Sequence, residues 1–127
     1  MDYKEMDSMD YYLKGLVEFE KECYDVAISY FERSNKLEEH FKSYERLYYC
    51  WSHLGDKKNA FVCIEKAYQL NPQNDKTAYE YAMMLVESGN CKLAQEVLSG
   101  IIQRNPTYKK AAVLAESLKQ KATSDLS

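Results

Sequence analysis

Cys50 and His53 are the two residues whose types and spacing come nearest to a reactive site. They are three residues apart, and a thiol beside an imidazole can act as a nucleophile with its base. On a helix over residues 41–54, however, Cys50 lies on the apolar stripe that faces the next helix, whereas His53 lies on a different face. We therefore interpret Cys50 as a small buried residue and His53 as a residue that stacks or forms hydrogen bonds.

The other candidates for chemistry form no reactive arrangement. The four cysteines show no Cys-x-x-Cys spacing, and His40 has no metal-binding residues at a suitable distance along the chain. Glu18, Glu20 and Glu22 alternate around the end of a helix, which is typical of a solvated face rather than of a catalytic carboxylate pair. The sequence thus predicts a protein that is not an enzyme and that holds no metal or cofactor.

Composition and charge narrow the class of protein. A chain of 127 residues with 46% hydrophobic and 29% charged residues is typical of one soluble domain. Its net charge of -3 argues against nucleic-acid binding. Met1 is followed by polar residues, and no apolar run is long enough to cross a membrane, so we expect a cytoplasmic protein with reduced thiols.

The charge is unevenly distributed along the chain. Residues 1–25 carry a net charge of -5, and residues 104–121 carry a net charge of +4. Solvated helix faces explain this asymmetry, but an acidic end and a basic end could also meet in head-to-tail assembly.

A loose repeat positions these residues. Gly55, Ala60 and Pro72 recur 34 residues later as Gly89, Ala94 and Pro106. Ala27 lies 33 residues before Ala60, and a large apolar residue follows each of the three alanines after four residues. Repetition at this period predicts stacked helical hairpins, in which the small alanine lets two helices approach closely.

Apolar residues spaced three and four apart predict seven helices. The first has a broad stripe that includes Leu13, Leu16 and Val17. The others are expected near 24–37, 41–54, 57–70, 75–87, 91–104 and 107–121. We expect a frayed N-terminus over residues 1–7, a single domain over 8–121 with repeats at about 8–39, 41–73 and 75–106, a capping helix over 107–121, and a disordered tail over 122–127.

This pattern resembles the tetratricopeptide repeat (TPR) family. The resemblance rests on Leu47, Trp51, Gly55, Ala60, Ile64, Ala67 and Pro72, then on Tyr81, Leu85, Gly89, Ala94, Leu98 and Pro106, and in the first repeat on Gly15, Tyr24, Ala27 and Phe31. The first repeat departs from the family at Ser34, where alanine is usual, and at Glu39, where proline is usual. The resemblance implies an all-α superhelix of three antiparallel helix pairs with a seventh, capping helix.

In this family the first helix of each pair lines a concave groove that binds peptides. Transfer of that pattern gives a set of candidate groove residues: Met9, Tyr12, Leu16, Phe19, Lys42, Glu45, Tyr49, His53, Lys76, Tyr79, Met83, Val86, Lys110 and Val113. The carboxylate clamp of one subclass is not expected, because only Lys76 matches it. Twelve tyrosines in the chain also suit a surface that meets a partner.

The sequence therefore predicts a protein-interaction module that binds a protein or peptide segment in this groove. Two alternatives remain open at this stage. One is a chaperone similar to the class II chaperones of type III secretion, which would hold an unfolded client. The other is a homo-oligomeric scaffold that stacks end to end, through an N-terminal end that has no capping helix.

Overall fold

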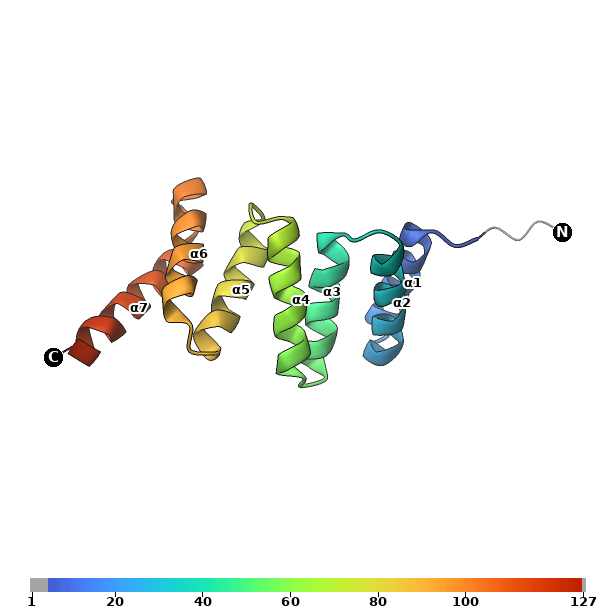
Figure 1. Cartoon of the computed structure of the whole chain (residues 1–127), viewed down its shortest axis with the longest axis horizontal. Helices are drawn as coiled ribbons and strands as arrows, with labels where there is room; N and C mark the ends of the chain where they lie inside the picture. The colour runs from blue at the N-terminus through green and yellow to red at the C-terminus, as the bar shows by residue number, and fades with distance from the viewer. Residues whose placement is uncertain (1–4, 127) are drawn as a thin grey trace. The chain divides into compact units, whose positions relative to one another are not determined.

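The structure is a computed structural model that describes residues 5–126, with side chains as far as residue 122. The chain divides into two compact units, which join at Asn71 and Pro72. The first unit contains α1 (Ser8–Glu20), α2 (Tyr24–Leu37), α3 (Phe41–His53) and α4 (Lys57–Leu70). The helices pack as the pairs α1–α2 and α3–α4, and α2 also packs against α3 (Figure 1).

The second unit contains α5 (Asp75–Glu87), α6 (Cys91–Arg104) and α7 (Lys109–Leu126). Helix α6 packs against both α5 and α7 (Figure 1). No strand occurs anywhere in residues 5–126. The expected all-α fold of helix pairs with a seventh helix is therefore confirmed. None of these helices is long and apolar enough to span a membrane, as far as the described residues go.

Two expected boundaries are wrong at the C-terminal end. The seventh helix begins at Lys109 rather than at residue 107, because Pro106 and Thr107 lie in a turn that the Tyr108 N–H closes on the Asn105 carbonyl at 3.1 Å. It continues to Leu126, so residues 122–126 are helical and not a disordered tail. The last residue, 127, lies outside the described part of the chain.

At the N-terminal end, residues 1–4 of the expected frayed segment lie outside the described residues. Asp7 is the N-cap of α1: its carboxylate accepts from the Asp10 N–H at 2.8 Å, and the Asp10 carboxylate accepts from the Asp7 N–H at 2.9 Å. This reciprocal capping satisfies two backbone donors that the helix cannot use. The grouping of all three pairs into one domain, residues 8–121, stays a prediction.

The same turn closes all three helix pairs. Gly55 and Gly89 follow α3 and α5 with φ of 77° and 87°, a left-handed conformation that glycine adopts without steric cost. In the first pair Glu22 takes this place with φ of 62°. Its N–H donates to the Phe19 carbonyl at 2.9 Å, and the next N–H, that of Cys23, donates to the Glu18 carbonyl at 2.9 Å. The first pair therefore keeps the turn geometry without its glycine.

The core of the first unit forms where α1 and α2 approach most closely. Ala27 and Phe31 of α2 are completely buried, as are Cys50 of α3 and Ile64 of α4. A β-carbon added at Gly15 of α1 would lie only 2.6 Å from Cε1 of Phe31, well inside van der Waals contact. The absence of a side chain at Gly15 thus lets the phenyl ring fill the space between the two helices.

The two departures of the first repeat from the family pattern both have partners in the structure. The Ser34 hydroxyl donates to the Ser8 carbonyl at 2.8 Å, which ties the end of α2 to the start of α1. Glu39 accepts from the Tyr44 hydroxyl at 2.8 Å and lies 3.6 Å from the Lys66 ammonium group of α4. Polar contacts therefore anchor the link between the first and second pairs, where the family usually has proline.

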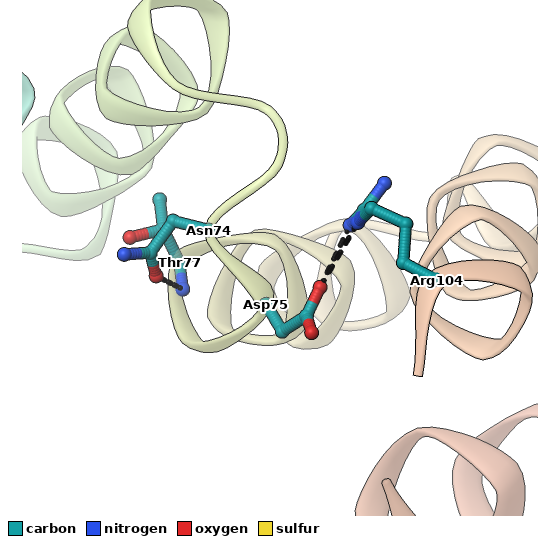
Figure 2. Close-up of polar contacts among 4 residues, drawn as sticks. All are labelled: Asn74, Asp75, Thr77 and Arg104. Carbon is teal, nitrogen blue, oxygen red and sulfur yellow. Dashed lines mark hydrogen bonds and ion pairs between the residues drawn. The ribbon is translucent and has the colours of Figure 1, made fainter. Parts of the chain in front are cut away.

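The second unit is packed around small residues. Ala78 and Ala82 of α5, Ala94 of α6 and Ala111 of α7 are completely buried, and larger apolar residues fill the space beside them. At the edge of this core, the Asn74 side chain caps α5 by accepting from the Thr77 N–H at 3.0 Å (Figure 2).

The end of α6 is tied to the start of α5 by a charged pair. Nη2 and Nε of Arg104 donate to one oxygen of Asp75 at 2.9 and 3.1 Å (Figure 2). Because Asp75 stands in the first turn of α5, it also complements the positive end of the helix dipole.

Candidate functional site

The residues first considered for chemistry are held in unreactive surroundings. Cys50 and Cys63 are buried, and burial raises the pKa of their thiols to about 11 and about 12. Both thiols therefore stay protonated near neutral pH, which is the opposite of what a nucleophile needs. The ring of His53 stacks on Tyr24 at a centroid distance of 4.5 Å with the planes 3° apart. Within the described residues, no three side chains form a group that could hold a metal ion.

A pocket of about 270 Å³ opens in the first unit where the start of α1, the end of α2 and the start of α3 meet. Three of the predicted groove residues line it: Met9 and Tyr12 from α1 and Lys42 from α3. We call this the first pocket. Its remaining lining residues, which sequence reasoning missed, are Ser8, Ser34, Glu38, His40 and Ser43.

Hydrogen bonds hold the polar wall of the first pocket in place. The hydroxyl groups of Ser8 and Ser34 lie 3.0 Å apart, and Ser34 is almost completely buried. Nδ1 of His40 accepts from the Lys42 N–H at 3.1 Å, so this imidazole caps α3. The backbone N–H of His40 in turn donates to the Asn35 side chain at 3.2 Å. A wall fixed in this way is organised before any ligand arrives.

Of the predicted groove residues on α1, Met9 is the most exposed, and Tyr12, Leu16 and Phe19 contribute less to an open surface. Tyr12 lies with its ring 5.7 Å from that of Phe31, and Phe19 lies 5.6 Å from Tyr24. Leu16 packs on the same core cluster. These three side chains are half-buried, so they form the base of the α1 face, whereas Met9 is 59% exposed and stands free of the core.

On α3, Lys42 and His53 are exposed, and Glu45 and Tyr49 are half-buried. The ring of Tyr49 lies 5.2 Å from that of Tyr48, which packs on the core cluster. Of these four residues only Lys42 lines the first pocket.

A second hollow, of about 380 Å³, lies in the second unit between α5 and α7. It brings together three further predicted residues, Tyr79, Lys110 and Val113. We call it the second pocket; Lys109, Leu114 and Ser117 complete its lining. Lys76 and Met83 are exposed and Val86 is half-buried, but none of the three lines this hollow.

An aromatic contact supports the second pocket. The ring of Tyr79 lies 6.1 Å from that of Tyr108. The pKa of the Tyr108 phenol is raised, first by burial and then by the nearby carboxylates of Asp75 and Glu80. The phenol therefore remains a neutral hydrogen-bonding group, and the two lysines supply the positive charge of this hollow.

The residues that sequence reasoning missed gave one weak signal. Ser34 departs from the alanine that is usual at its place, and the structure shows its hydroxyl bonded to α1 at the first pocket. Glu38 and His40 lie in the link between helix pairs, whose course the helical periodicity does not specify, and Ser8 and Ser43 lie in the first turns of α1 and α3.

Comparison with known proteins agrees with this geometry. Residues 48–74 match the sequence model of the family described as tetratricopeptide repeat. No match to the chain was found among curated proteins. Many solved structures share the fold, and three of them are reported below.

The structure of YrrB, described as a TPR protein with an unusual peptide-binding site, has a TM-score of 0.77 and 21% identity, covering 91% of this chain. The chain spans only 60% of that protein's length. The first TPR of Spaghetti (RPAP3), bound to an HSP90 peptide, has a TM-score of 0.76 and 14% identity, covering 92% of this chain and 94% of that one. The Yersinia enterocolitica type III secretion translocator chaperone SycD has a TM-score of 0.70 and 17% identity, covering 91% of this chain and 93% of that one. Identities at this level show the shared fold alone. Residues 48–74 thus match the tetratricopeptide repeat by sequence, and most of the chain shares the fold of solved TPR structures.

Proposed function

We propose that the chain is a protein-interaction module that binds a peptide segment of another protein, with the first pocket as its main anchoring site. The observation that carries the proposal is the meeting of Met9, Tyr12 and Lys42 around one pocket. All three residues stand at positions that the resemblance to the TPR family assigns to its groove. Their convergence supports a binding role for this face of α1 and α3.

The size of the first pocket favours a side chain of a peptide over a free metabolite. Its volume of about 270 Å³ lies just below the range of roughly 300–1,000 Å³ that is usual for small-molecule sites. An apolar ligand side chain would lie against Met9 and Tyr12, since methionine and tyrosine are adaptable contact residues. Lys42 would attract a carboxylate of the ligand and set its orientation and association rate more than its affinity.

The second pocket would offer a second anchoring site with the same combination of ring, apolar side chain and lysine. It holds Tyr79 and Val113 beside Lys109 and Lys110, so an acidic residue next to an apolar one would suit it. The remaining groove residues, Glu45, Tyr49, His53, Lys76, Met83 and Val86, stay predictions for parts of the ligand outside the two pockets.

Peptide-library selection followed by fluorescence anisotropy tests the proposal. A peptide selected on the wild-type chain should bind Met9→Ser and Lys42→Glu about tenfold more weakly, because these changes remove an apolar contact and reverse a charge at the pocket. Val62→Ser is the matched control: Val62 is 57% exposed, nearly as much as Met9, but lies on α4 and does not line the pocket. Unchanged affinity in both pocket variants, or equal loss in the control, would overturn the assignment.

The chaperone alternative has support only at the level of fold, through the likeness to SycD. It differs from peptide binding in what the ligand is, an unfolded client rather than a defined segment. Hydrogen exchange of the bound partner separates the two: protection of backbone amides over one short segment of the partner would favour the peptide module. The scaffold alternative depends on the ends of the chain, where α1 and α7 lie.

A further inference from the structure

Helix α1 exposes a face that is covered on its counterpart in the next repeat. On α3, which packs against α2, Ser43, Leu47 and Cys50 are buried. The residues 33 positions earlier on α1 are Asp10, Lys14 and Val17. Val17 is 53% exposed and Leu13, one turn before it, is 51% exposed, so part of the broad apolar stripe of this helix faces solvent. A helix-binding face is therefore left open on α1, as far as the described residues go.

Helix α7 exposes a second such face. Its inner side, with Ala111 and Leu118, is buried against α6. A different side, which borders the second pocket, carries Val113, which at 69% is more exposed than any other large apolar residue described, with Lys110 and Glu116 exposed before and after it in the helix. About two helix turns thus present an apolar residue between a base and an acid.

The net charges of the two helices are opposite in sign. Helix α1 holds three acids and one base, a net charge of -2, whereas α7 holds four lysines and two acids, a net charge of +2. Pairing of α1 with α1 in a two-fold dimer would bring like charges together, which costs free energy. Pairing of α1 with α7 of a different copy brings unlike charges together.

We propose that α1 of one copy lies antiparallel along α7 of a second copy, so that the chain assembles head to tail. One register aligns the side chains in order. With Val17 opposite Val113, Lys14 falls opposite Glu116, and Glu20 falls opposite Lys110, because each lies three residues, about 4.5 Å, from its valine. An apolar contact is then flanked by two ion pairs. In one pair α1 supplies the base and in the other it supplies the acid, and this pattern sets both the direction and the register of the two helices.

This assembly has a defined symmetry. Because the two contacting faces differ, each bound copy keeps one free α1 or one free α7, and association continues beyond the dimer. The first pocket is not part of this contact, whereas Lys110 and Val113 also line the second pocket, so the assembly would compete with a ligand bound there but not with one in the first pocket. Screening of the ion pairs by salt should weaken the assembly.

Sedimentation of complementary variants tests the arrangement. Val17→Lys places a base against α7 and blocks the α1 face, and Val113→Glu places an acid against α1 and blocks the α7 face. Each variant alone should remain a monomer at concentrations at which the average molecular mass of the wild type increases. An equimolar mixture should associate again, because one intact face of each kind remains and the two substituted side chains, which have opposite charges, lie opposite each other in the proposed register. Val62→Lys, at a comparably exposed valine of α4, should associate like the wild type.

Charge exchange tests the register. Lys14→Glu and Glu116→Lys should each raise the dissociation constant about fivefold, as expected for surface ion pairs, and the double variant should return it to within about twofold of the wild-type value. Circular dichroism should show unchanged helix content in all variants, since the altered side chains are exposed. A wild type that stays monomeric up to its solubility limit, a mixture that fails to pair, or a double variant that associates no better than the singles would each overturn the proposal.

Discussion

Substitution of Gly15 by alanine provides a direct test of how closely α1 and α2 approach. In a helix interior, glycine to alanine normally stabilises by roughly 0.8–1 kcal/mol, because alanine loses less backbone entropy on folding. At Gly15 the new methyl group would lie 2.6 and 2.7 Å from Cε1 and Cδ1 of Phe31. Carbon atoms prefer a separation of about 3.5–4.0 Å, so the ring must move by about 1 Å.

The Phe31 ring has little room for that movement. It is completely buried, and the ring of Tyr12 lies 5.7 Å away on one side. Overpacking of this kind costs roughly 1–3 kcal/mol. The cost exceeds the gain in helix propensity, and we expect Gly15→Ala to lower the free energy of unfolding by about 1 kcal/mol.

Gly100→Ala is the matched control. Gly100 is the other glycine inside a helix, and a methyl group there would meet only Nη1 of Arg104, at 3.4 Å. This variant should raise the free energy of unfolding by up to about 1 kcal/mol, so the two substitutions should change stability in opposite directions. Urea unfolding followed by circular dichroism at 222 nm, an amide wavelength that reports helix content, measures both. A Gly15→Ala variant as stable as the wild type would refute the close contact with Phe31.

Three further outcomes follow from single residues. Glu22→Gly should raise the urea midpoint by removing a left-handed strain of roughly 1 kcal/mol, and a lowered midpoint would contradict the φ of 62°. Ala60→Leu should cost roughly 1–3 kcal/mol, because Ala60 is 1% exposed at the contact of α3 with α4; an unchanged midpoint would remove it from that contact. Burial and the bond to Glu39 raise the pKa of Tyr44 from 10.0 to about 12, so the folded chain holds this proton more tightly. Stability should therefore fall between those pH values, and Tyr44→Phe should show a smaller fall in pH-dependent urea titrations.

The sequence was sufficient for the fold because most helix ends and the spacing of the small residues can be read along the chain. Gly55 and Gly89 end helices through backbone freedom, and Ala60 and Ala94 repeat at the spacing that stacked hairpins need. The candidate site was predicted only in part. The family's positions gave Met9, Tyr12 and Lys42, among others, but could not tell which of the groove residues would share a pocket.

Tertiary packing decided what periodicity leaves open. A helical stripe cannot distinguish a side chain that a neighbouring helix covers from one that no helix covers: Leu13 and Val17 belong to the apolar stripe of α1, yet both are exposed. Likewise, no spacing rule assigns a partner to Ser34, because its bond to Ser8 joins residues 26 positions apart. The sequence by itself determined the helices, their pairing and their ends other than those of α7, which depend on neighbours along the chain. The tertiary structure alone decided which faces stay open and which polar groups meet, because burial depends on what lies across space.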